Sequence, residues 1–125
     1  MPWAITFGRP AQELLSAVAL SATAFRPSDA LPAVLSLQTG GLIQDASGPE
    51  IRAVARLDAE LFRGRERLGL LARARDLLPG QVVIFLTGRD ADGKILPAGP
   101  YRLRLVAVPT SGGPATTRTI TFRVK

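Results

Sequence analysis

The chain of 125 residues contains neither cysteine nor histidine. Without cysteine there is no disulfide framework and no thiolate chemistry, which leaves the redox environment of the protein open. Without histidine the chain lacks the commonest general base, the commonest zinc ligand and any Ser-His or Cys-His catalytic pair. We therefore expect a non-enzymatic protein with no catalytic residues, no metal centre and no cofactor.

Aromatic residues are scarce as well, with one tryptophan, one tyrosine and five phenylalanines. A carbohydrate-binding β-sandwich needs exposed aromatic rings, and nucleic-acid modules usually interleave rings that stack on bases. Lysine is almost absent, because all of the 16 basic residues except Lys94 and Lys125 are arginine. The few rings disfavour carbohydrate binding and base stacking, whereas the arginines leave the binding of acidic groups open.

Long hydrophobic runs are missing too. No run of about 18 apolar residues occurs, so we expect no transmembrane helix. The nearest candidate, residues 14–25, is short and lacks the cationic segment that begins a signal peptide. No clear signal peptide is therefore visible in the sequence.

The charge is unevenly distributed along the chain, whose formal net charge is +6. Residues 1–50 hold two basic and four acidic side chains, and residues 51–125 hold fourteen basic and six acidic ones. A basic half can bind nucleic acid, an anionic surface or an acidic protein. The alternative is the ordinary charged surface of a soluble β-sandwich.

Alternation of apolar and polar residues predicts strands rather than helices. The clearest predicted strand is residues 51–62, where a period of two separates an apolar face from a charged one. Its apolar face holds Ile51, Ala53, Ala55, Leu57, Ala59 and Leu61, and its polar face holds Arg52, Arg56, Asp58 and Glu60. Residues 12–24 fit a helix or a strand, and we favour a strand. Further strands are predicted over residues 3–7, 32–37, 67–71, 82–86, 101–108 and 117–124.

Turn signals divide these strands. Residues 25–29, 45–50, 63–66 and 109–115 are predicted turns or loops, and residues 72–78 are predicted to be irregular. The strands at 82–86 and 101–108 are predicted to pair antiparallel across the Gly- and Asp-rich turns between them. About seven or eight short strands indicate an all-β, immunoglobulin- or fibronectin-III-like antiparallel β-sandwich. We expect a single domain over residues 1–125, with residues 1–10 as a leading segment.

Residues 54–107 contain a series of short motifs. An alternating strand and turn precede Leu78-Pro79-Gly80 and an apolar strand, and then Gly88-Arg89-Asp90-Ala91-Asp92-Gly93 and Gly99-Pro100-Tyr101 follow. The block resembles the immunoglobulin-like domain of the flagellar hook-capping protein, which also occurs as C-terminal modules of exported bacterial proteins. Such domains carry Trp-Asp where this chain has Leu86-Thr87. Phe25-Arg26-Pro27-Ser28 is similar to the Phe-x-Pro-Asn that opens them.

The resemblance implies a fold and a class of role. It implies a structural or protein-interaction module of an exported, cell-envelope or extracellular bacterial protein, whose partner is another protein or a neighbouring domain. A flagellar hook-cap-like assembly role is one alternative, and binding of a polyanion such as nucleic acid is another. The motifs are turn and packing motifs, so they imply no catalytic residue.

Two carboxylates and three glycines make residues 87–101 a candidate site. Asp90 and Asp92 with Gly93 are similar to the start of a calcium-binding loop, but Lys94 and the apolar residues after it do not continue that pattern. We favour a turn in which an aspartate binds backbone N–H groups and Gly93 adopts a positive φ. Tyr101 is predicted to be buried, with its hydroxyl group bonded at a corner of the sandwich.

Arginines form the candidate partner surface. If the strands at 51–62 and 101–108 are neighbours, Arg52, Arg56, Arg102 and Arg104 share one sheet face, with Asp58 and Glu60 near them. Opposite charges across strands stabilise a sheet by only about 0.2–1 kcal/mol per pair, which is the structural interpretation of this pattern. The functional interpretation is a surface that binds an acidic protein or a polyanion.

Overall fold

The computed structural model describes residues 14–45, 48–110 and 112–125, with side chains described for 14–40, 53–110 and 112–125. The strand predicted at residues 3–7 and the leading segment 1–10 lie outside the described residues. No part that the structure describes forms a helix long and apolar enough to cross a membrane. All regular elements in the described ranges are strands: β1 (Leu15–Leu20), β2 (Ala24–Phe25), β3 (Ala33–Thr39), β4 (Gly41–Asp45), β5 (Gly48–Arg52), β6 (Val54–Arg63), β7 (Glu66–Leu77), β8 (Gly80–Leu86), β9 (Gly99–Pro109) and β10 (Thr116–Val124).

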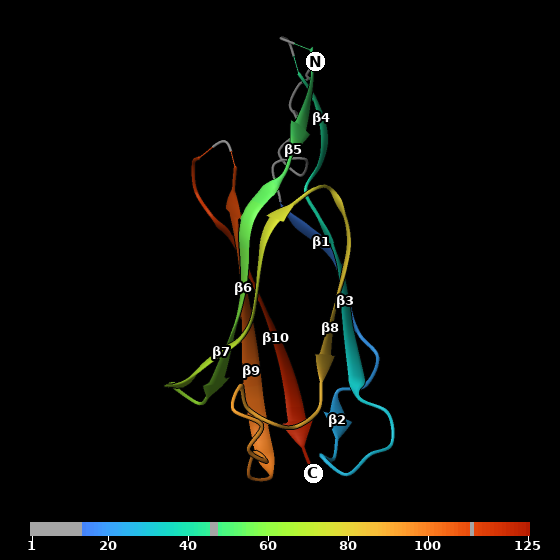
Figure 1. The fold of residues 1–125 in the computed structure, drawn as a ribbon, viewed down its shortest axis with the longest axis vertical. Coiled ribbons are helices and arrows are strands. Elements are labelled where there is room, and N and C mark those ends of the chain that lie inside the picture. Colours follow the sequence, from blue (N-terminus) through green and yellow to red (C-terminus); the bar gives the residue numbers. More distant parts are fainter. Residues whose placement is uncertain (1–13, 46–47, 111) are drawn as a thin grey trace, which may run out of the picture.

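The strands form two main sheets that face each other, with a separate hairpin (Figure 1). The small sheet has the order β1-β3-β8 and is antiparallel throughout. The large sheet has the order β2-β10-β9-β6-β7, in which only the short pairing of β2 with β10 is parallel. The hairpin of β4 and β5 extends from one end of the two sheets. The predicted all-β class is confirmed, and the two facing sheets are consistent with a β-sandwich.

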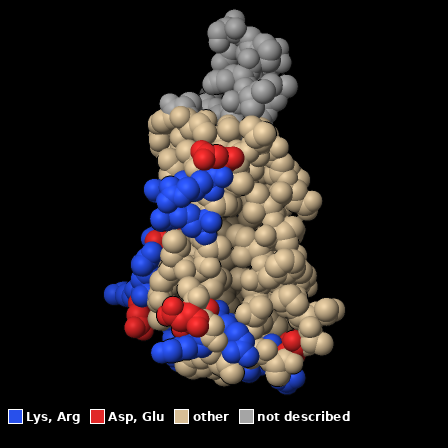
Figure 2. All heavy atoms as spheres, in the orientation of Figure 1, with Lys and Arg blue, Asp and Glu red and all other residues tan. Residues whose placement is uncertain are grey.

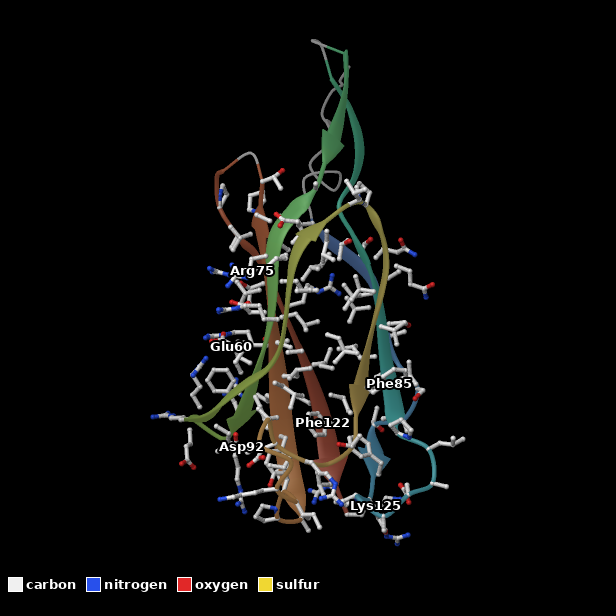
Figure 3. All side chains as sticks on the ribbon, in the orientation of Figure 1. Glu60, Arg75, Phe85, Asp92, Phe122 and Lys125 are labelled. Atoms are coloured by element: carbon white, nitrogen blue, oxygen red, sulfur yellow. The ribbon has the colours of Figure 1, made fainter. Side chains whose placement is uncertain are left out.

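The core lies between the two sheets and follows the predicted period of two. Leu103 and Leu105 of β9 are fully buried, and Phe122 and Val124 of β10 point the same way, as predicted. Leu35 and Leu37 of β3 are buried on the opposite side of the core, in the small sheet. Side chains from both sheets occupy the space between the ribbons (Figure 3). Burial of these side chains is the main favourable contribution to folding.

The predicted strand over residues 51–62 is two strands. Ala53 separates β5, which pairs only with β4, from β6 in the large sheet. The pairing of β6 with β9 shifts between Val54 and Arg56, so that Val54 is buried although it lies one residue off the predicted apolar face. A bulge of this kind changes which face a side chain occupies, and no alternation rule anticipates it. The loop predicted at 45–50 is also shorter, since β5 starts at Gly48.

The segment after the turn at Gly64 is a single long strand. We predicted a strand at 67–71 and irregular structure at 72–78, but β7 continues through all twelve residues to Leu77. It pairs with β6 along its length, with two register irregularities. One side of β7 faces solvent, so the strand carries many charged residues. These residues made the alternation of apolar and polar positions hard to recognise in the sequence.

The strands on either side of residues 87–98 do not pair with each other. β8 pairs with β3 in the small sheet, whereas β9 lies between β6 and β10 in the large sheet. The predicted antiparallel hairpin is therefore wrong, and the segment crosses from one sheet to the other (Figure 1). Leu86, which stands where the similar domains carry tryptophan, is 2% exposed and packs in the core. Beside it the rings of Phe25, Phe122 and Tyr101 stack, with centroids 5.4 and 5.8 Å apart.

Candidate functional site: an arginine-rich sheet face

The outer face of the large sheet is built on β6, which lies between β9 and β7. Glu60 is opposite Arg104 of β9, and Asp58 is opposite Arg73 of β7. The prediction that the 51–62 and 101–108 segments are neighbours is thus confirmed for β6 and β9. Because Leu57 points into the core, the alternating residues Asp58 and Glu60 project from the opposite face.

Arginines surround these two carboxylates on three strands. Figure 2 shows basic side chains gathered along the left and the lower end of the view, whereas most of its right half is uncharged. Arg123 of β10 projects from the same sheet face, next to this group. We define the arginine face as the side chains on β6, β7 and β9 that surround Asp58 and Glu60, namely Arg56, Arg67, Arg73, Arg75, Arg102 and Arg104.

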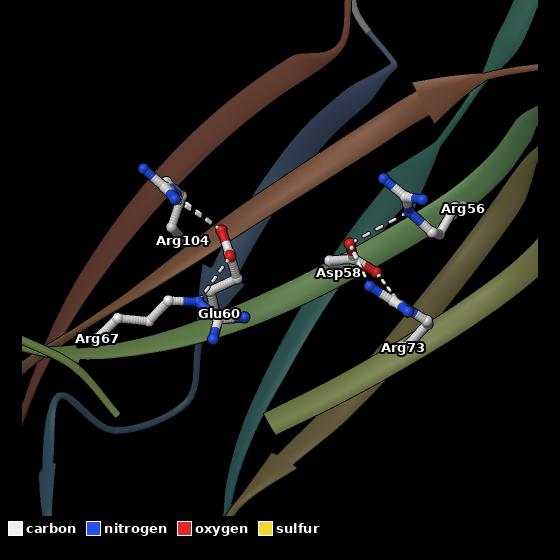
Figure 4. A network of polar contacts seen from close by, with 6 residues as sticks. All are labelled: Arg56, Asp58, Glu60, Arg67, Arg73 and Arg104. Atoms are coloured by element: carbon white, nitrogen blue, oxygen red, sulfur yellow. Dashed lines mark hydrogen bonds and ion pairs between the residues drawn. The ribbon is translucent and has the colours of Figure 1, made fainter. Parts of the chain in front are cut away.

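Asp58 is held by two arginines (Figure 4). Arg73 donates a bidentate pair, with Nε 2.7 Å from Oδ1 and Nη2 3.1 Å from Oδ2. Arg56 Nε lies 3.2 Å from Oδ2 as an ion pair, although it lacks hydrogen-bond geometry. The hydrogen bonds from Arg73 outweigh the effect of burial and lower the pKa of Asp58, and the same contact raises the pKa of Arg73. These arginines therefore favour the ionised form of Asp58.

Glu60 bridges two strands in the same way (Figure 4). Arg104 of β9 donates to Oε1 from Nε at 2.9 Å, and Arg67 of β7 donates to Oε2 from Nε at 3.0 Å. Burial alone would raise the pKa of Glu60, but the hydrogen bonds from the two arginines prevail and lower it. Both carboxylates are thus neutralised by arginines of the face itself.

One aromatic ring supports the arginines of β9. The guanidinium carbon of Arg104 lies 4.8 Å from the centroid of the Phe62 ring, and that of Arg102 lies 5.4 Å from it. Arg102 Nη2 also donates to the carbonyl oxygen of Gly64 at 2.5 Å. A cation over a ring face at such distances is attracted to it and held in one orientation. Phe62 is covered by these cations, so it is no open stacking platform.

The face retains a surplus of unpaired cationic groups. Within the described residues, neither Arg75 nor Arg102 forms an ion pair with a carboxylate. Arginine presents several N–H donors in a planar fork, so a side chain with one occupied donor can still bind a carboxylate. The arginine face can therefore bind anionic groups at several positions spread over three strands.

The structure places three of the four predicted partner residues together. Arg56, Arg102 and Arg104 lie on this face, whereas the side chain of Arg52 lies outside the described residues. Sequence reasoning missed Arg67, although it begins the predicted strand 67–71, and it missed Arg73 and Arg75 because residues 72–78 were predicted to be irregular. The alternation of Arg73-Ala74-Arg75 was the signal that could have revealed them.

The Asp90 turn has the predicted local geometry. Asp90 Oδ1 accepts hydrogen bonds from the backbone N–H groups of Asp92 and Lys94, each at 2.9 Å, and Gly93 has φ of 84°. Asp90 and Lys94 are also joined by a backbone hydrogen bond of 2.9 Å. One carboxylate oxygen of Asp90 is therefore committed to the turn. Tyr101 is buried and donates to the carbonyl oxygen of Pro97, which is the predicted corner.

An opening lies between the edge strands β7 and β8. It has a volume of about 320 Å³ and apolar walls that include Leu71, Ile84 and Phe122, with Arg89 and Asp90 among its lining residues. No group of three or more metal-ligating side chains occurs among the residues that the structure describes. The arginine face, with six arginines on three strands, is therefore the candidate site.

No model of a protein family matches the chain, and no curated protein matches its sequence. The arginine face is therefore the feature of the molecule that indicates a function.

Proposed function

We propose that this chain is a non-enzymatic, immunoglobulin-like module of an exported or cell-envelope bacterial protein, and that it binds an acidic protein partner. The observation that carries the proposal is the arginine face, on which six arginines surround two carboxylates that are already paired. The surplus of positive charge gives the face a potential that attracts acidic surfaces. The resemblance of residues 54–107 to modules of exported proteins supports the class and the location.

The shape of the face favours a protein over a small ligand. Its donors are distributed over β6, β7 and β9 and do not converge on one pocket. Carboxylates of a partner protein can each take a bidentate contact with one guanidinium group. The face suits several separate carboxylates on a folded surface.

Two other functions are alternatives to binding of an acidic protein. A flagellar hook-cap-like assembly domain would use the same face against a neighbouring subunit, and the motifs of residues 54–107 support it. A polyanion such as nucleic acid is supported by the net charge of +6. Against the polyanion, Phe62 is the one ring of β6, β7 and β9 on the outer side of the sheet, since Tyr101 is buried, and two arginines lie over it.

A salt titration with three probes separates these functions. We would measure binding of the full chain to poly-glutamate, heparin and duplex DNA at increasing salt. Our proposal expects salt-dependent binding to poly-glutamate that is lost in the double variant Arg75→Glu, Arg102→Glu. The matched control is Arg26→Glu, Lys94→Glu, which changes the net charge equally but lies in exposed loops.

The outcomes differ for each hypothesis. Equal losses in both double variants would show that net charge alone causes binding, and would contradict the arginine face as a site. Preferential binding of heparin or DNA with a steeper salt slope would favour the polyanion alternative. Circular dichroism of each variant checks that the sheets still form.

A further inference from the structure

The small sheet differs from the large one in having no charge. β1, β3 and β8 together contain not one Asp, Glu, Lys or Arg. On the outer side of this sheet Val83 is 45% exposed and Phe85 is 61% exposed, and Val34 of β3 is opposite Phe85. Phe85 lies away from the large sheet (Figure 3). The molecule therefore has an arginine face on one sheet and an uncharged, partly apolar face on the other.

β8 is also the edge strand of the small sheet, and no strand of the described residues pairs with its outer edge. Its seven residues pair with β3 in continuous register, without a bulge, and include neither proline nor a charged residue. The nearby edge strand β7, in contrast, carries arginines and two register irregularities. Charges and bulges are the usual devices that stop a sheet edge from pairing with another strand. A regular, apolar edge without them is a template for strand addition.

We propose that β8 pairs antiparallel with β8 of a second copy of this chain, about a two-fold axis at Val83. In this register Val83 meets Val83, Val82 meets Ile84, Gln81 meets Phe85 and Gly80 meets Leu86. Every one of these cross-strand pairs is uncharged. The free backbone groups along both edges would then be hydrogen-bonded, and the two small sheets would become one continuous sheet.

Self-complementarity favours a second copy as the occupant of the β8 edge. With a net charge of +6, two copies of the chain repel each other wherever their basic surfaces meet, and the strands of the small sheet are free of that charge. β8 has no charged side chain that would select a partner of opposite charge. Two antiparallel copies of β8, in contrast, place only uncharged side chains opposite each other. On the inner side, Ile84 lines the opening of about 320 Å³ beside β7, so Val82 of the second copy would be added to its apolar wall. This inference is independent of the proposed function, because the arginine face lies on the other sheet.

The oligomeric state tests the proposal. Sedimentation of the full chain is expected to show a concentration-dependent species of twice the 13.3 kDa of one chain. Higher salt should strengthen the dimer by screening the repulsion between copies, whereas it weakens binding of acidic partners.

Val83→Lys places two like charges opposite each other and should weaken association about tenfold or more. The control Ile95→Lys adds the same charge at a 60% exposed loop residue and should leave the dimer intact. A monomer at every concentration and salt, or a dimer that tolerates Val83→Lys, would overturn the proposal.

A disulfide trap tests the register. Because the chain has no cysteine, a single introduced cysteine can cross-link only to its equivalent in another copy. Residues directly opposite in an antiparallel pair have Cα atoms about 4.5–5.5 Å apart, which a disulfide can span. Val83→Cys should therefore oxidise to a cross-linked dimer, whereas Gln81→Cys should not, because its two copies would be separated by four residue steps. Preferential cross-linking through position 81 would overturn this pairing.

Discussion

The carboxylate of Asp58 and the guanidinium group of Arg73 form a bidentate pair across β6 and β7, with N–O distances of 2.7 and 3.1 Å. Glu60 makes the equivalent connection between β7 and β9 through Arg67 and Arg104. The two carboxylates thus join three neighbouring strands of the large sheet on its solvent side. The same contacts that create the arginine face also hold its strands together.

We expect acid to destabilise the protein through these two carboxylates. The pKa values of Asp58 and Glu60 are lowered in the folded chain, so the unfolded chain binds protons first as the pH falls. Their contribution is complete above the unfolded pKa values, at about pH 4, and is lost as the pH falls through the folded values. Urea unfolding at a series of pH values should show this decline.

Asp58→Asn provides the matched variant for the acid effect. It should lower the melting temperature at neutral pH and flatten the decline of stability in acid. Asp92→Asn is the control, because Asp92 forms no ion pair within the described residues. A pH profile of Asp58→Asn that matches that of the unmodified chain would contradict the assignment.

Tyr101→Phe tests the corner between the two sheets. The change removes the hydroxyl group that donates to the carbonyl oxygen of Pro97 at 2.5 Å and keeps the ring beside Phe122. We expect a loss of about 1 kcal/mol in the free energy of unfolding, measured by urea denaturation. Tyr101→Leu also removes the stacked ring and should cost clearly more. Equal effects of the two variants would show that the hydroxyl group, and not the ring, holds the corner.

Gly88→Ala tests the close approach of two loops. Gly88 has φ of 79°, and a Cβ atom built there would lie 2.9 Å from Cγ of Pro27. Gly93 has a similar φ of 84° but open space around its Cβ position, so Gly93→Ala is the control for backbone strain alone. We expect Gly93→Ala to cost about 1–2 kcal/mol and Gly88→Ala about 1 kcal/mol more. Thermal unfolding of both variants measures the difference, and equal costs would show that Pro27 moves aside.

Phe62→Leu tests the support of the β9 arginines. The leucine keeps an apolar side chain and removes the ring that Arg102 and Arg104 cover. Unfolding should become easier by about 0.5–1 kcal/mol, and poly-glutamate should bind more weakly although the net charge is unchanged. Phe85→Leu, which removes an exposed ring from the other sheet, should leave poly-glutamate binding unchanged. Binding that is the same in both variants would contradict a positioning role for Phe62.

Sequence patterns predicted much of this fold where a strand has one buried and one exposed side. In β9 and β10 the alternation of Leu103, Leu105 and Phe122 with polar residues gave the correct inward face. The turn at Asp90 followed from local chemistry, because its hydrogen bonds join residues at most four positions apart. Three of the predicted arginines also lie on one face, since the same alternation places them there.

The wrong predictions concern segments whose structure depends on their position in a sheet and not on the local sequence pattern. The long strand β7 was missed because an edge strand with one solvent side needs few apolar residues. The supposed hairpin of β8 and β9 failed because turn residues show that the chain reverses, but not whether it remains in the same sheet. The bulge after Val54 depends on the strands that lie beside it.

The sequence by itself determined the strand-rich class, the absence of thiol and imidazole chemistry and the surplus of arginine. Those properties follow from residue types and from contacts between near neighbours in the chain. The tertiary structure decided which strands meet, and so it alone gathered Arg67 and Arg73 beside Asp58 and Glu60. It also put the charges on one sheet and left β8 as an uncharged edge of the other. Sheet order depends on contacts between residues far apart in the sequence, which no short pattern encodes.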